Sequence, residues 1–253
     1  MKKTFGLCVF YSFCLTAMAA ALDTNAVSRL EKEGRYAEAL ALCESADESA
    51  AALCMQGEYY LHGRKGVAVD KNRGRQCFRR AMEILKPAAE SGDAPAQYQF
   101  ALCHEYGVDD LKTAREWYIK AADAGNAKAM FKAGWFAARR LGADGMEVAE
   151  ARDLALRYAK AASDAGDGDG TALLAWLAYL DCKGRDFEKA LPMLMKSVEN
   201  NSPLGMTLLG RMYYDGRGVA KDLEKAELYL QRAVDLGYSE ASATLDEIKK
   251  RKK

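Results

Sequence analysis

Apolar and small residues recur along this chain at helical spacing, in blocks that end on a glycine or an asparagine. Each block has an alanine eleven residues before its end, large apolar residues seven or eight before it, and a small residue four before it. These offsets put the apolar positions on one stripe of a helix. Glycine and asparagine readily adopt the left-handed conformation that ends a helix. The block ends are Gly92, Gly125, Gly166, Asn201 and Gly237.

A second helix is predicted before each block, because small residues recur there at two positions that lie five residues apart. Small residues on two sides of a helix allow close approach to two neighbours. The later positions are Gly57, Ala101, Gly134, Ala175 and Gly210, and the earlier ones are Ala52, Ala96, Ala129, Gly170 and Gly205. The chain therefore repeats a pair of helices, A and B, at intervals of 33 to 41 residues.

The turn between helices A and B is similar in the first and last copies. Residues 59–70 read YYLHGRKGVAVD, and residues 213–222 read YYDGRGVAKD. The glycines allow a tight turn, and the final aspartates, Asp70 and Asp222, are placed to cap helix B. The second copy has a shorter turn, the third has an irregular one around residues 141–150, and the fourth has DCKGRD instead.

The last copy, with LLGRMYYDGRGVAKDLEKAELYLQRAVDLGYSEA, resembles the Sel-one-like repeat, a relative of the tetratricopeptide repeat. The resemblance extends over residues 48–246. It implies an all-α fold, a right-handed α-α superhelix or solenoid of about five helix pairs, with helices A lining the concave face. It also implies a non-catalytic scaffold, expected to be a monomer, that binds another protein or peptide.

The segments outside the repeats have their own predicted roles. Residues 1–21 combine Lys2 and Lys3 with an apolar run and small residues at its end, which is typical of a signal peptide. We expect an exported protein, periplasmic or secreted, with no integral membrane segment after cleavage. Residues 22–47 predict a tetratricopeptide-like helix pair. Asp246 replaces the small residue of a last helix A, which suits a capping helix, and residues 247–253 form a basic tail that we interpret as solvated.

The charge of the chain does not favour nucleic acid as a partner. The formal net charge is +1, with 37 basic and 36 acidic residues, and removal of Lys2 and Lys3 with the signal peptide makes it −1.

Sequence motifs for catalysis or for cofactor binding were not found, so we predict no catalytic residue, no metal and no cofactor. His62 and His104 are the only histidines, and with Cys103 they offer a metal site, but packed or exposed histidines are the favoured interpretation. Residues 164–171, DAGDGDGT, resemble part of a calcium loop, yet they lack its later glutamate. A turn between helices explains them better.

Candidate partner-binding residues come directly after the small residue of helix A. Trp135 and Trp176 occupy this position in two copies, and Arg211 and Glu58 occupy it in the last and first copies. Stacked repeats would place the tryptophans on one face as a contact stripe. The alternative is that they pack against helix B.

Five cysteines remain after removal of the signal peptide, so at least one is unpaired. The resemblance implies disulfides between helix B of one unit and helix A of the next. Cys43–Cys54 is the first predicted pair and Cys77–Cys103 the second, which leaves Cys182 free. The alternative is that all five are small buried hydrophobes.

Two other functions remain open at this point. One is an envelope enzyme related to β-lactam-interacting cysteine-rich repeat proteins, and the absence of a nucleophile motif argues against it. The other is a structural, cell-wall-associated protein.

Overall fold

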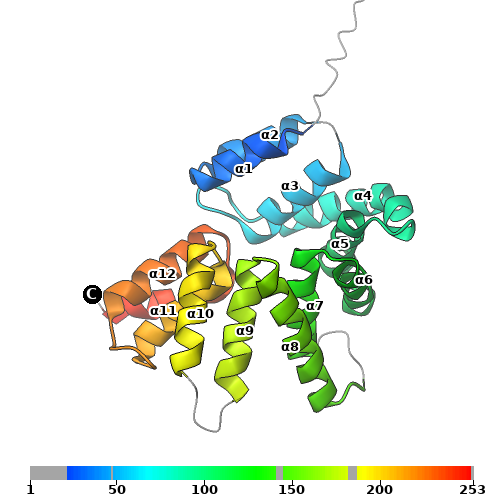
Figure 1. Cartoon of the computed structure of the whole chain (residues 1–253). Helices are drawn as coiled ribbons and strands as arrows, with labels where there is room; N and C mark the ends of the chain where they lie inside the picture. Colours follow the sequence, from blue (N-terminus) through cyan, green and yellow to red (C-terminus); the bar gives the residue numbers. More distant parts are fainter. Residues whose placement is uncertain (1–21, 47, 141–144, 182–186, 252–253) are drawn as a thin grey trace, which may run out of the picture.

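The computed structural model describes residues 22–46, 48–140, 145–181 and 187–251. Within these residues the chain is all-α, and its helices form a curved stack of antiparallel pairs (Figure 1). The first pair is α1 (Thr24–Lys32) and α2 (Tyr36–Ser45). The A helices are α3 (Ala50–His62), α5 (Ala94–Leu102) with the π-helix η1 (Cys103–Val108), α7 (Ala127–Arg139), α9 (Gly168–Asp181) and α11 (Pro203–Asp215).

The B helices alternate with these along the chain. They are α4 (Lys71–Glu90), α6 (Leu111–Asp123), α8 (Val148–Asp164), α10 (Phe187–Glu199) and α12 (Leu223–Asp235). A short 3-10 helix, η2 (Ser239–Ala241), leads into α13 (Ser242–Arg251). Asp246 of α13 is exposed, as expected of a capping helix. The predicted superhelix of helix pairs is therefore confirmed.

Local chemistry sets the helix ends where the sequence predicts them. Asp70 accepts a hydrogen bond from the backbone N–H of Arg73, and Asp222 accepts from two N–H groups of the first turn of α12. Both aspartates therefore cap a helix B. All five predicted block ends have a positive φ, from 59° at Asn201 to 98° at Gly92.

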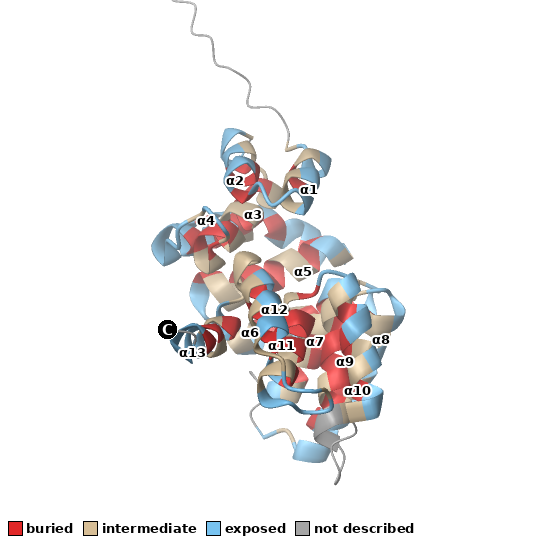
Figure 2. Cartoon of the chain, turned by 90° about the vertical axis from the view of Figure 1, so that its left-hand side faces the viewer, coloured by how far each residue is buried: buried red, intermediate tan, exposed pale blue. Residues whose placement is uncertain are grey.

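Close packing of helices A and B follows from the small residues. A Cβ added at Gly134 would lie 3.1 Å from Leu173 and 3.3 Å from the carbonyl oxygen of Ala155, so α7 approaches both α8 and α9. Figure 2 shows the buried residues concentrated between the helices, with exposed residues on the outer faces. The alanine of every helix B stripe is buried: Ala81, Ala114, Ala155, Ala190 and Ala226.

The two ends of the repeat stack contact each other. Leu236, which follows α12, packs against a core cluster that contains Val27 of α1 and Tyr36 of α2. An extended solenoid brings each repeat into contact with its neighbours only. The stack is therefore curved enough to return to its own beginning.

Some predicted features lie outside the described residues. These are the signal peptide, the fourth turn with Cys182, and the last two residues of the basic tail. Within the described ranges, no helix combines the length and the apolar character needed to cross a membrane.

Candidate interaction surface

The two tryptophans at the shared repeat position lie next to each other. Trp135 of α7 and Trp176 of α9 have ring centroids 6.2 Å apart, with 43° between the ring planes. Both are partly buried and pack against the core cluster between α7 and α11. The guanidinium of Arg139 lies 5.1 Å from the centroid of Trp135. Two consecutive A helices thus contribute adjacent tryptophan rings, and the part of each ring that is not packed on the core faces solvent.

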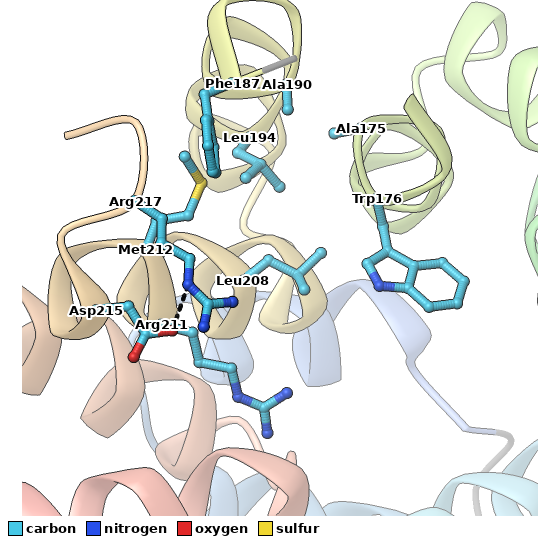
Figure 3. A pocket seen from close by; sticks show the side chains of 10 residues that line it. All are labelled: Ala175, Trp176, Phe187, Ala190, Leu194, Leu208, Arg211, Met212, Asp215 and Arg217. Carbon is cyan, nitrogen blue, oxygen red and sulfur yellow. Dashed lines mark ion pairs between the residues drawn. The ribbon is translucent and has the colours of Figure 1, made fainter. Parts of the chain in front are cut away.

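Three hollows meet at Trp176. The first, of about 200 Å³, lies between α9, α10 and α11 and is lined by Leu194, Leu208 and Met212 (Figure 3). The second, of about 210 Å³, lies between α7, α8 and α9 on the other side of Trp176. The third, of about 100 Å³, lies between the two tryptophans, Arg211 and Tyr238. Trp176 is the wall that these hollows share.

Arg211 lies at the edge of the first and third hollows with its charge uncompensated. Its side chain is exposed and donates one hydrogen bond, to the carbonyl oxygen of Glu240 at 2.8 Å. No carboxylate of the described residues forms an ion pair with it, whereas Arg217 pairs with Asp215 at 3.2 Å. The uncompensated guanidinium attracts negative charge to this edge.

The carboxylate of Glu240 is occupied elsewhere. It pairs with Arg139 at 3.8 Å. This ion pair joins α7 to η2, so it connects the A helix of the third unit to the segment that leads into α13. It also leaves the Glu240 backbone oxygen as the partner of Arg211.

Glu58 does not belong to this surface. It is half-buried on α3 and acts electrostatically on Tyr98 of α5, whose pKa is raised well above its ordinary value by burial first and by Glu58 second. None of the three hollows includes Glu58 among its lining residues. Three of the four predicted contact residues therefore meet in one place, and the fourth lies apart.

A partly buried polar cluster that the sequence did not reveal lies beside Trp135. The ammonium of Lys132 donates to both carboxylate oxygens of Glu105, at 2.9 and 3.1 Å, and to the hydroxyl of Tyr106 at 2.9 Å. The hydroxyl of Tyr118 donates to Glu105 at 2.5 Å. Burial alone lowers the pKa of Lys132, but Glu105 and the tyrosines outweigh it and raise that pKa well above its ordinary value. The Lys132–Glu105 ion pair joins α7 to η1.

This cluster depends on the π-helix η1. Its wider turn interrupts the regular helical spacing after Cys103, and π-helical segments of this kind are uncommon. Lys132 precedes Trp135 by three residues, so the two lie on one face of α7. In the sequence, the three-residue separation of Lys132 and Trp135 is the only sign of the cluster. It does not indicate Glu105 as the partner of Lys132.

The histidines are packed side chains. His62 contacts Tyr106 edge-to-face at 5.2 Å, and burial lowers the pKa of His62 to about 4. The rings of His104 and Phe100 have centroids 4.8 Å apart. The Nδ1 atom of His104 lies 3.8 Å from a carboxylate oxygen of Asp110. In the described part of the chain, no three His, Cys, Asp or Glu side chains gather in a group that could hold a metal ion.

Two aspartates of residues 164–171, Asp167 and Asp169, act at helix starts. Asp167 accepts from the backbone N–H of Gly170 at 2.6 Å and so caps α9. Asp169 accepts from the hydroxyl of Ser202, which itself caps α11. The stretch is thus a turn between helices, as the sequence predicted, and it fixes α9 to the start of α11.

The predicted disulfide pairings are not formed, because Cys43, Cys54, Cys77 and Cys103 are all free and buried. Cys43 and Cys77 lie in the core cluster beneath α1 and α2, while Cys54 and Cys103 lie in the next cluster along the stack. Each predicted pair is therefore divided between two clusters. The thiol beside Cys54 is that of Cys103, and their hydrogen bond is the main cause that raises the pKa of Cys54.

Comparison with known proteins gives the family. The model of the Sel1 (Sel-one-like) repeat matches residues 48–93, 94–126, 127–167 and 203–238. The chain is 33% identical over 161 residues to the Sel1-repeat-containing protein YjcO of Escherichia coli K12, which covers 60% of this chain and 67% of YjcO. The chain belongs to the Sel1 repeat family, whose members are generally protein-interaction scaffolds. The α9–α10 pair falls outside these matches.

Solved structures show the same fold. A Sel1 repeat protein from Oxalobacter formigenes superposes with a TM-score of 0.52 at 25% identity, covering 90% of this chain and 88% of that chain. The protein c5321, a protective antigen of uropathogenic Escherichia coli, has a TM-score of 0.52 at 21% identity over 88% of this chain and 55% of its own. The second likeness is one of fold alone.

Proposed function

We propose that this chain is a non-catalytic interaction scaffold of the bacterial envelope, which binds an extended segment of a partner protein around Trp135 and Trp176. The observation that carries the proposal is the convergence of three hollows on Trp176, beside a second tryptophan on the next A helix. Tryptophan and arginine are the residues most enriched among those that dominate binding energy at protein interfaces.

The size of the hollows favours a protein segment over a small metabolite. Pockets for drug-sized ligands usually enclose about 300–1,000 Å³. The hollows here measure about 200, 210 and 100 Å³ and are separated by the Trp176 ring. Each suits a single side chain, and an extended segment presents several side chains in a row.

The rigid surroundings of the surface also support the proposal. The Lys132–Glu105 ion pair and the Asp169–Ser202 contact hold the A helices on both sides of the tryptophans. A surface that is already in its binding geometry loses little conformational entropy when a partner binds. The envelope location rests on the signal-peptide pattern of residues 1–21.

Site-specific photo-crosslinking in the native host tests this function. A photoreactive phenylalanine analogue at Leu208, which lines two of the hollows, should give a discrete adduct with an envelope protein. The matched control carries the same analogue at Leu228, which is 56% exposed on α12 and away from the hollows. The adduct should disappear in a Trp135→Ala/Trp176→Ala background. Equal adducts from both positions, or none from Leu208, would contradict the proposal.

A further inference from the structure

We infer that the surface selects partner segments in which a carboxylate lies next to an apolar side chain, with Arg211 as the residue that recognises the carboxylate. This inference rests on the proposed function and specifies its ligand. It combines two observations made at one place: an apolar hollow between α9, α10 and α11, and an uncompensated guanidinium at its edge.

The apolar half of the ligand is defined by the lining of the first hollow. Leu194 and Met212 are buried and form its inner wall, and Leu208 lies between Trp176 and the arginines in Figure 3. The hollow of about 200 Å³ has room for one aliphatic or aromatic side chain. An apolar side chain that enters it is removed from water on several sides, which is the favourable term in binding.

The carboxylate half is defined by charge. The Arg211 guanidinium makes one of its possible hydrogen bonds, to a neutral backbone carbonyl, so most of its donors remain available. The neighbouring carboxylates are engaged by other arginines, Asp215 by Arg217 and Glu240 by Arg139. A planar guanidinium binds a carboxylate through two parallel hydrogen bonds. Arg211 therefore complements an acidic group that lies one or two residues from the apolar anchor.

The acidic group has two chemical sources in a peptide, an Asp or Glu side chain and a free carboxyl terminus. Purified protein is therefore tested on two immobilised peptide libraries of random sequence, one with both ends blocked and one with a free carboxyl terminus. Peptides that bind are expected to contain Leu, Ile, Met or Phe within two positions of a carboxylate. The library that gives these peptides identifies the source.

Isosteric peptide pairs then measure the role of Arg211. One peptide from the library and its Asp→Asn (or amidated) counterpart are titrated by fluorescence anisotropy. The wild type should bind the carboxylate form about tenfold more tightly, as expected for a hydrogen bond between charged groups. Arg211→Gln should bind the two forms about equally. Arg232→Gln is the matched control, since Arg232 is exposed on α12 of the same unit, and it should keep the tenfold preference.

The outcomes separate the inference from the function on which it rests. Binding of apolar peptides without a carboxylate preference, or an undiminished preference in Arg211→Gln, overturns the inference and leaves the proposed function standing. Absence of any binding by the wild type on both libraries contradicts the proposed function, and the inference falls with it.

Discussion

The backbone N–H of Lys65 donates a hydrogen bond to the carbonyl oxygen of Asp235, at an N–O distance of 3.2 Å. Lys65 belongs to the turn after α3, and Asp235 is the last residue of α12. The contact therefore joins the first repeat to the last. Each A–B pair packs against its neighbours, and the first and last units also contact each other. The tryptophans belong to units between these two ends of the stack.

The closure predicts that Gly237 is unusually sensitive to substitution. A Cβ at Gly237 would overlap the Arg64 guanidinium and the Gly63 carbonyl oxygen of the first turn. Gly166 ends a helix with nearly the same φ, 83° against 81°, and has open space around it. Gly166→Ala should cost only the strain of a left-handed alanine, about 1–2 kcal/mol. Gly237→Ala should lower the urea midpoint clearly further, and equal midpoints would show that the closure adds no stability.

The packing of α7 predicts a second stability effect. Gly134→Leu places a side chain where a single Cβ would already lie 3.2 Å from the Ala159 nitrogen, so α7 and α8 must separate. Overpacking of this kind costs about 1–3 kcal/mol. Lys128→Leu, on the exposed face of the same helix, is the control and should change the free energy of unfolding little. A Gly134→Leu variant with the wild-type urea midpoint would argue against the helix register.

Acidification should destabilise the protein through His62. Burial lowers its pKa from 6.5 to about 4, so the unfolded chain binds a proton more readily than the folded one. The neutral, partly buried His62 therefore contributes to the free energy of unfolding. This contribution is constant above pH 6.5 and decreases as the pH falls from 6.5 toward 4. Between pH 7 and pH 5, wild type should lose roughly 1–2 kcal/mol more unfolding free energy than His62→Phe. Parallel losses in the two proteins would rule out His62 as the cause.

The cysteines should behave as buried thiols. Burial raises the pKa of Cys43 to about 11, and thiolate is the reactive form. Native protein should therefore react slowly with iodoacetamide at Cys43, Cys54, Cys77 and Cys103. In urea without reductant all four should be alkylated, to the same extent as in a sample reduced beforehand. A disulfide-linked peptide pair from any two of them would contradict the free state.

The fold was predictable because its signals are local. An aspartate at a helix start, a glycine at a helix end and a stripe of alanines act through neighbours in the sequence, and Asp222, Gly237 and Ala226 show all three in one repeat. The closure between Lys65 and Asp235 carries no such signal. The contact forms only because the rotations between five successive units add up to bring the last unit back to the first. Small changes in any turn would alter that sum.

The candidate site was predictable only in part, for the same reason. The alignment of the repeats gives Trp135, Trp176 and Arg211 the same position on successive A helices. The structure brings the three side chains together. Glu58 has the same position on α3, but α3 is the A helix of the first unit, and the A helices α5 and α7 lie between it and α9 along the stack. The cysteine pairings failed because they depend on the direction in which a side chain leaves its helix, and adjacent positions on α3 face different core clusters.

The central claim is that the surface around Trp135 and Trp176 binds the partner, and calorimetric titration with the partner segment found by crosslinking tests it most directly. Truncation of a residue that dominates an interface costs about 2 kcal/mol or more. The Trp135→Ala/Trp176→Ala variant should therefore bind at least about 100-fold more weakly while its helical circular dichroism matches wild type. Ile84→Ala/Leu228→Ala, at exposed apolar residues of two B helices, should bind like wild type. An affinity of the tryptophan variant within about twofold of wild type, or a loss of fold together with binding, would contradict the account.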